Sequence, residues 1–267
     1  MAAALLACGG LHDPAFAASA FGIDGNGQLR SISNLSTMSS TVLGLTPFTY
    51  GATNGNVGLA QSPSGQLYAG DNFGNIWALS MTGVATPIGN TGVAAPITGL
   101  DWDPVNNSLL VFTGSPAYQI FRASPLTGAQ ISPAINVNLG GGRAESIAWL
   151  NPGRALITYK DPGNTISIVQ LVAFGSGALV GVPDSTSILQ EWTGVDVDPV
   201  TGDIFMIGRL DDSWQVTNAA GTLSATHLAT GNHLDWTAFT LESVPEPATG
   251  LLLSGGVLFL ATRRRRK

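Results

Sequence analysis

The sequence predicts an all-β fold, a β-propeller of five blades with four strands in each blade. An apolar segment that ends at a proline turn recurs four times, with spacings of 41, 48 and 47 residues between Pro63, Pro104, Pro152 and Pro199. A period of 40–50 residues is typical of propeller blades. The composition agrees, since 34 glycines, 15 prolines and only 10% charged residues suit many short strands joined by turns.

Each repeat is expected to contain an apolar first strand, a proline turn, two further strands, a Thr-Gly-type turn and a fourth strand. The expected first strands begin at Gly58, Gly99, Ser146 and Gly194. The expected second strands begin at Leu67, Leu109, Ala155 and Ile204, and the third strands at Ile76, Gln119, Ile166 and Ser213. Fourth strands are recognised near Ile88, Ile135 and Leu223, but none is recognised in the third repeat.

The two ends of the repeat region predict how the ring closes. Residues 236–241 match the first strand of the fourth repeat, at 192–197, but no further strands follow them. Residues 21–24, 29–32 and 41–44 match second, third and fourth strands without a first. Together these four segments form the fifth blade, and closure of the ring hides sheet edges that would invite aggregation. Six or seven blades are the alternative, if the segments 46–57 or 172–191 add strands.

Three segments are predicted along the chain: a leader at 1–18, the propeller at 19–243 and a tail at 244–267. The leader is apolar, and Ala15-Phe16-Ala17 and Ala18-Ser19-Ala20 both fit a small-x-small cleavage site. It resembles the end of a secretory signal peptide, although no Lys or Arg opens it. The segment that ends at Cys8 loosely resembles a lipoprotein box, but we favour cleavage downstream. Because Cys8 is the only cysteine, the body is expected to contain no disulfide.

The tail has three parts, a Pro-Glu-Pro segment, an apolar run from Leu251 to Ala261, and a basic end. The 15 residues from Ala248 to Thr262 carry no charge and would extend about 22 Å as a helix. This length is short for a bilayer core of about 30 Å. The basic end is expected to stay in the cytoplasm, so the rest of the chain would lie outside.

The order of these parts resembles the PEP-CTERM sorting signal of Gram-negative bacteria. The resemblance rests on Pro245, Glu246 and Pro247, the apolar run, and the basic residues Arg263, Arg264, Arg265, Arg266 and Lys267. It implies export, transient insertion of the tail in the inner membrane, recognition by an exosortase-like enzyme, and delivery to the cell surface or extracellular matrix. It covers about 24 residues and implies nothing about the fold of the body. A tail that anchors the protein permanently is the alternative.

The charge distribution narrows the class of partner. The net charge is −6, but five of the 11 basic residues lie in the tail. From Ser19 to Val244 there are 6 basic and 15 acidic side chains, a formal charge of −9. An acidic body makes nucleic acid an unexpected partner and argues against adhesion to anionic lipid. The expected ligand is an extracellular polysaccharide or protein.

Two Asp-x-Asp-Pro segments are the candidate sites for chemistry. They contain Asp101 and Asp103 in the second repeat and Asp196 and Asp198 in the fourth. First strands line the channel of a propeller, so these carboxylates are weak candidates for a Ca²⁺ site or for catalysis. Asp before Pro at a strand end is ordinary turn chemistry, in which the carboxylate caps backbone N–H groups, and we favour that interpretation. The matching positions in the other repeats are not acidic.

Other polar segments point to turns and loops. Asp24-Gly25-Asn26-Gly27 and Asp71 to Asn75 resemble fragments of calcium loops but lack the bidentate Glu, so hairpin turns are favoured. His227 is expected in a fourth strand and His233 in a loop, and no Gly-x-Ser-x-Gly elbow occurs. We therefore predict no catalytic residues, no metal and no cofactor. The predicted function is non-enzymatic binding or structural display, with an exported hydrolase or lyase that acts at the channel mouth as the alternative.

Overall fold

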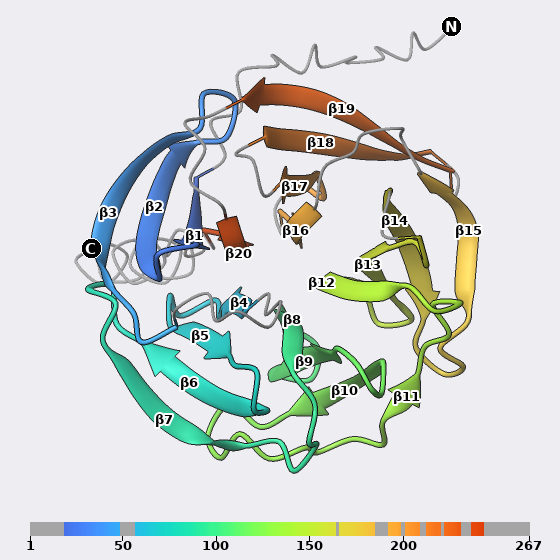
Figure 1. Cartoon of the computed structure of the whole chain (residues 1–267), viewed down its shortest axis with the longest axis horizontal. Coiled ribbons are helices and arrows are strands. Elements are labelled where there is room, and N and C mark those ends of the chain that lie inside the picture. Colours follow the sequence, from blue (N-terminus) through green and yellow to red (C-terminus); the bar gives the residue numbers. More distant parts are fainter. Residues whose placement is uncertain are drawn as a thin grey trace, which may run out of the picture.

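The computed structural model describes residues 19–48, 57–163, 166–184, 192–198, 201–208, 212–219, 222–230 and 236–242. Within these ranges it contains twenty strands, which form five four-stranded blades around a central axis (Figure 1). The predicted all-β, five-bladed propeller is confirmed. The leader at 1–18 and the tail at 244–267 lie outside the described residues, and the described part contains no helix long and apolar enough to span a membrane.

Each blade has a first strand nearest the axis and a fourth strand at the rim (Figure 1). The first blade contains β4 (Gly58–Gln61), β5 (Leu67–Gly70), β6 (Asn75–Leu79) and β7 (Ala85–Asn90). The second contains β8 (Ile97–Asp103), β9 (Ser108–Thr113), β10 (Gln119–Ala123) and β11 (Ile135–Asn136). The third contains β12 (Arg143–Asn151), β13 (Arg154–Lys160), β14 (Ser167–Ala173) and β15 (Leu179–Asp184). The fourth contains β16 (Trp192–Val197), β17 (Ile204–Gly208), β18 (Asp212–Ala219) and β19 (Thr222–Thr230).

The fifth blade closes the ring as the sequence predicts. Its strands are β20 (Trp236–Leu241), β1 (Ala20–Asp24), β2 (Gln28–Asn34) and β3 (Ser39–Leu45). The antiparallel pairing of β20 with β1 places Ala20 opposite Leu241 and Gly22 opposite Phe239. The C-terminal first strand therefore completes a sheet that the N-terminal side of the body begins.

Residues 179–184 are the fourth strand of the third blade, which the sequence did not reveal. They form β15, so this segment completes an expected blade and does not add a sixth. A single parallel bridge between Val182 and Thr222 also joins β15 to β19 at the rim. The segments 49–56 and 185–191, which were the other material for extra blades, lie outside the described residues.

The core is divided among the five seams between neighbouring blades. Each of five clusters of buried apolar side chains draws its members from two adjacent blades. Trp236 is fully buried, and it packs with Phe205 and Ile207 between the fourth and fifth blades. Trp102 and Trp149 pack against seam clusters from half-buried positions. All three tryptophans therefore contribute to the packing between blades.

Glycines allow the first strands to approach each other closely around the axis. A Cβ atom added at Gly99 would lie 2.6 Å from the backbone nitrogen of Ile147 in the next blade. One added at Gly194 would lie 2.3 Å from the Cβ of Phe239. Atoms cannot approach so closely without displacement, so both seams require glycine. The close approach also brings side chains of one first strand within hydrogen-bonding distance of the next.

The Thr-Gly turns found in the sequence make contacts between neighbouring blades at the rim of the ring. Gly83 adopts a φ of 80° and lies against Gly44 on the outer strand of the preceding blade. Gly128 adopts a φ of 70°, and an added Cβ there would lie 2.7 Å from the carbonyl carbon of Gly89. Glycine reaches this backbone conformation without steric cost. The turn between the third and fourth strands of one blade therefore packs closely against the outer strand of the preceding blade.

Candidate functional site

A cavity of about 420 Å³ lies at the end of the channel where the first strands finish. All five blades contribute to its lining, for example through Gln61, Trp102, Trp149, Asp198 and Leu241. Three of the described lining residues are aspartates and none is basic. Its volume falls within the range of about 300–1,000 Å³ that is typical of small-molecule pockets.

Asp101 lies on β8 and is only 7% exposed. One carboxylate oxygen accepts a hydrogen bond of 2.6 Å from the backbone N–H of Trp102. The other accepts a hydrogen bond from the backbone N–H of Trp149, which belongs to β12 in the third blade. The side chain therefore ties the second blade to the third at the channel mouth.

Asp196 occupies the matching place on β16 and is 8% exposed. Its Oδ1 accepts a hydrogen bond of 2.7 Å from the backbone N–H of Val197. Its Oδ2 accepts one of 2.9 Å from the hydroxyl of Thr240 and one of 2.7 Å from the backbone N–H of Leu241. Both donors to Oδ2 lie on β20, so Asp196 ties the fourth blade to the fifth as Asp101 ties the second to the third.

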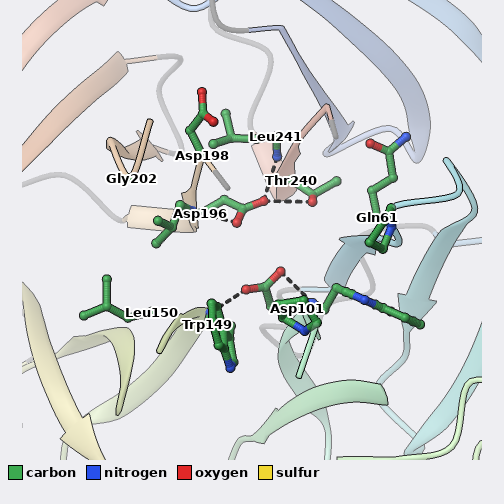
Figure 2. A pocket seen from close by; sticks show the side chains of 13 residues that line it. Gln61, Asp101, Trp149, Leu150, Asp196, Asp198, Gly202, Thr240 and Leu241 are labelled. Carbon is green, nitrogen blue, oxygen red and sulfur yellow. Dashed lines mark hydrogen bonds between the residues drawn. The ribbon is translucent and has the colours of Figure 1, made fainter. Parts of the chain in front are cut away.

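Burial changes the acidity of both carboxyls. It raises the pKa of Asp101 well above the ordinary 3.8, and the negative charges of Asp196 and Asp103 raise it further, against the lowering effect of the two backbone N–H groups. Burial likewise raises the pKa of Asp196 to about 6, although hydrogen bonds from Leu241 and Thr240 oppose the change. Figure 2 shows the two carboxylates pointing into the channel from facing walls. The negative charge of Asp196 therefore makes ionisation of Asp101 less favourable.

Asp103 and Asp198 play the role that turn chemistry predicts. Asp103 Oδ1 accepts hydrogen bonds from the backbone N–H groups of Val105, at 3.0 Å, and Asn106, at 3.1 Å. Burial alone would raise the pKa of Asp103, but hydrogen bonds from Arg122 and Asn106 outweigh it and hold this pKa below 3.8. The Arg122 guanidinium lies 2.6 Å from the carboxylate. Asp198 accepts a hydrogen bond of 3.1 Å from the backbone N–H of Thr201.

The loops that resemble calcium-binding segments are hairpin turns. Asp24 Oδ1 accepts hydrogen bonds of 2.9 Å from the backbone N–H groups of Asn26 and Gln28. Asp71 Oδ1 does the same for Phe73, at 2.8 Å, and Asn75, at 2.9 Å. These turns join the second and third strands of their blades, at the end of the ring opposite the cavity. Across the described ranges, no three His, Cys, Asp or Glu side chains are grouped to hold a metal ion.

Of the two histidines of the body, only His227 is described, and it lies away from the cavity. His227 is on the outer strand β19, where its Nε2 lies 3.1 Å from Asp212 Oδ1 and its ring packs against Trp214 at 4.6 Å between centroids. His233 lies outside the described residues. The glycines 140–142 connect β11 to β12, as expected of a link between blades.

Comparison with protein families identifies a known motif in the tail. Residues 243–266 match the model of the PEP-CTERM protein-sorting motif. The chain carries a PEP-CTERM sorting motif. The resemblance of the tail to this signal is confirmed, and the matched range contains Pro245, Glu246, Pro247 and the arginines Arg263 to Arg266. A motif of this kind implies an exported protein of a Gram-negative bacterium that is processed by exosortase-type machinery.

Three solved structures are similar to this chain at low sequence identity. Virginiamycin B lyase from Staphylococcus aureus is 12% identical with a TM-score of 0.44, over 75% of this chain and 63% of the lyase. The WD40 β-propeller domain of Doa1 is 11% identical with a TM-score of 0.44, over 78% and 79%. The Dos1 propeller is 10% identical with a TM-score of 0.41, over 74% and 52%. Comparison with curated proteins finds no match.

Proposed function

We propose that this protein is a non-enzymatic binding protein of the bacterial cell surface or extracellular matrix. The apolar run of the tail holds an inner-membrane intermediate, exosortase-type processing removes the tail near Pro247, and the propeller is the part that works outside the cell. The observation that carries the proposal is the joining of a sorting motif to a closed ring whose cavity receives side chains from all five blades. Binding sites for ligands are typically pre-formed cavities of this kind.

The hydrogen bonds that the two facing carboxylates accept favour a binding function over a catalytic one. Asp101 accepts two hydrogen bonds and Asp196 accepts three, and two of the donors are backbone N–H groups of the next blade. A general acid or base must exchange its proton with the substrate, which requires contact with the reacting atom. Carboxylates that fasten blades together are fixed in place, which suits recognition of a ligand of complementary shape and charge.

The walls of the cavity support a ligand with an apolar face. Trp102 and Trp149 offer indole surfaces, and Pro63, Pro104 and Leu150 add aliphatic surface. Aromatic side chains provide large contact areas for sugar rings and for protein side chains. An extracellular polysaccharide or a protein that inserts one group into the channel mouth is therefore the proposed class of ligand.

The intact mass of the protein from its native host tests this proposal. The mass is measured separately in membrane, surface and medium fractions. We expect a form that lacks everything after about Pro247, located outside the cytoplasmic membrane. Replacing Pro245, Glu246 and Pro247 with alanine should leave the full mass in the membrane, whereas Ser254→Ala in the same tail should not. A wild-type protein found only at full mass in the membrane would instead be permanently anchored.

A hydrolase or lyase is the second candidate function, because carboxyls with raised pKa values inside a cavity are a physical mark of catalytic sites. A broad panel of glycoside, lactone and phosphoester substrates tests it. Turnover that disappears when Asp101, Asp103, Asp196 and Asp198 are all replaced by alanine would establish the enzyme. Turnover that survives this replacement would exclude the channel mouth as its site.

A further inference from the structure

We propose that the cavity at the channel mouth binds an organic cation, an ammonium group carried on an apolar or sugar framework. This proposal rests on the binding function proposed above and names the chemistry of the ligand. Asp101, Asp196 and Asp198 line the cavity, and no basic side chain is among the described residues of the lining. The site therefore attracts positive charge, and the carboxylates of Asp101 and Asp196 would repel an anionic ligand.

The carboxylates of Asp101 and Asp196 are already oriented to accept hydrogen bonds from such a ligand. Each carboxylate can accept about four hydrogen bonds. Asp101 accepts two from the protein and Asp196 accepts three, so each keeps acceptor capacity toward the channel into which it points (Figure 2). The bonds from Trp149 and Leu241 fix the orientation of the carboxylates before a ligand arrives. A ligand that donates hydrogen bonds therefore meets acceptors that need no rearrangement.

The aromatic walls favour an ammonium group over a metal ion. Trp102 stacks on Tyr68, with ring centroids 5.9 Å apart and planes 19° from parallel, which holds its indole in place. The face of an indole attracts a cation within about 6 Å of its centre. Calcium requires six to eight oxygen ligands, whereas indole and aliphatic side chains make up much of this lining. Carboxylates beside indole rings are the combination that an organic ammonium ion needs.

A neutral polyol fits the cavity less well than a cation does. Sugar hydroxyls accept as well as donate hydrogen bonds, and they need donors on the protein. The hydroxyl of Thr240 already donates to Asp196, and the acidic side chains of the cavity only accept when ionised, which leaves the Gln61 amide and the indole N–H groups as the side-chain donors of the described lining. Burial also makes the ionised carboxylates costly, and a bound cation would offset that cost for Asp101 and Asp196 together.

Calorimetric titration of the full chain, purified in a mild detergent, tests the proposal without any mutation. Phenethylammonium and phenethyl alcohol share one framework and differ in charge. At pH 7.5 we expect the ammonium to bind one site per chain at least tenfold more tightly than the alcohol, and to lose affinity as the pH falls below about 6, the pKa of Asp196. Equal affinities, or no binding of either probe, would overturn the proposal. Tighter binding of Ca²⁺ that displaces the ammonium would replace it with a metal site.

Two variants locate the bound cation. Asp196→Asn removes the charge but keeps an oxygen for the N–H of Leu241, and it should weaken ammonium binding about tenfold or more. Asp161→Asn removes a charge from a turn at the opposite end of the third blade, where Asp161 accepts a hydrogen bond of 2.8 Å from Ile166, and it should change the affinity less than twofold. Equal losses in both variants would contradict a site at the channel mouth. Far-UV circular dichroism verifies folding, and the comparison of probes on wild-type protein stands if Asp196→Asn does not fold.

The source of the ammonium group is resolved by paired ligands. Glucosamine oligomers represent an extracellular polysaccharide and a lysine peptide represents a protein, and each is compared with its N-acetylated form. We expect acetylation, which removes the charge, to abolish binding of whichever ligand is recognised. Failure of every ammonium ligand would overturn this inference alone, because export and tail processing are measured independently by intact mass.

Discussion

Replacing Asp196 with asparagine should flatten the pH dependence of folding stability between about pH 4 and pH 7. In the folded protein burial raises the pKa of this carboxyl from 3.8 to about 6. In the unfolded chain the side chain meets water and releases its proton near 3.8. Between these values the folded state holds a proton that the unfolded state has lost, so the free energy of unfolding falls as the pH rises. The full cost is present above about pH 6.

The size of the effect follows from these values. The difference between 6 and 3.8 corresponds to about 3 kcal/mol, of which about 2 kcal/mol develops between pH 4.5 and pH 7.5. The raised pKa of Asp101 acts in the same direction, and the two facing carboxyls titrate as a pair. Asp103 acts oppositely, because its lowered pKa stabilises the fold above its unfolded value and this contribution is lost on acidification below it. We therefore expect greatest stability between about pH 4 and pH 5.

Urea unfolding of the wild type and of Asp196→Asn, followed by tryptophan fluorescence at four pH values from 4.5 to 7.5, measures this effect. The wild type should lose about 2 kcal/mol more than the variant over that range. Gly175→Ala, which meets open space and changes no titratable group, serves as the control, and its curve should run parallel to that of the wild type. Parallel curves for Asp196→Asn and the wild type would refute the reasoning, since they would mean that Asp196 carries no elevated pKa in the folded state.

Three further predictions concern the stability of the ring, and chemical denaturation checks all of them. Gly99→Ala should destabilise the fold by about 2 kcal/mol or more, because the added Cβ would lie 2.6 Å from a backbone nitrogen, whereas Gly175→Ala, with open space around it, should be neutral; equal effects would contradict the close approach of the first strands. Asp103→Ala should cost about 1–3 kcal/mol, because it uncaps a turn and leaves Arg122 without its carboxylate, and Asp103→Asn should cost less because it keeps the caps. Removal of residues 236–267 deletes the first strand of the fifth blade and should abolish cooperative unfolding, whereas removal of the sorting motif alone should leave the unfolding midpoint unchanged.

Most of the fold can be predicted from sequence because its strongest patterns are local. First strands are apolar and end at proline turns, and a Thr-Gly turn precedes the fourth strands of the first and second blades, so short windows identify them. Fourth strands lie at the rim and carry a weaker pattern, as in β7, where no residue is fully buried. The strand β15 contains an internal glycine and a proline, which are uncommon inside strands, and for that reason it is not recognisable before the structure is known.

The candidate site could be predicted only in part, for a similar reason. The partners of Asp103 lie two and three residues away, at Val105 and Asn106, so turn chemistry identifies its role. The partner of Asp101 in the next blade, Trp149, lies 48 residues along the chain. The partner of Asp196, Leu241, lies 45 residues along. Both separations are about one blade period, but a sequence gives no sign that a carboxylate spans a seam until the distance between first strands is known.

The cost of the two buried carboxylates is a further reason, beside the geometry of the cavity, to assign the channel mouth a ligand. The matching positions of the first and third repeats hold Ala60 and Ala148, so the ring closes seams of the same kind without a buried acid. Asp196 alone makes the fold about 3 kcal/mol less stable at neutral pH than an aspartate of ordinary pKa would, and Asp101 adds to that cost. Groups that reduce stability and face a cavity are typical of functional sites. A bound cation would return most of this energy, so the stability of the propeller should rise on binding by more at pH 7 than at pH 5.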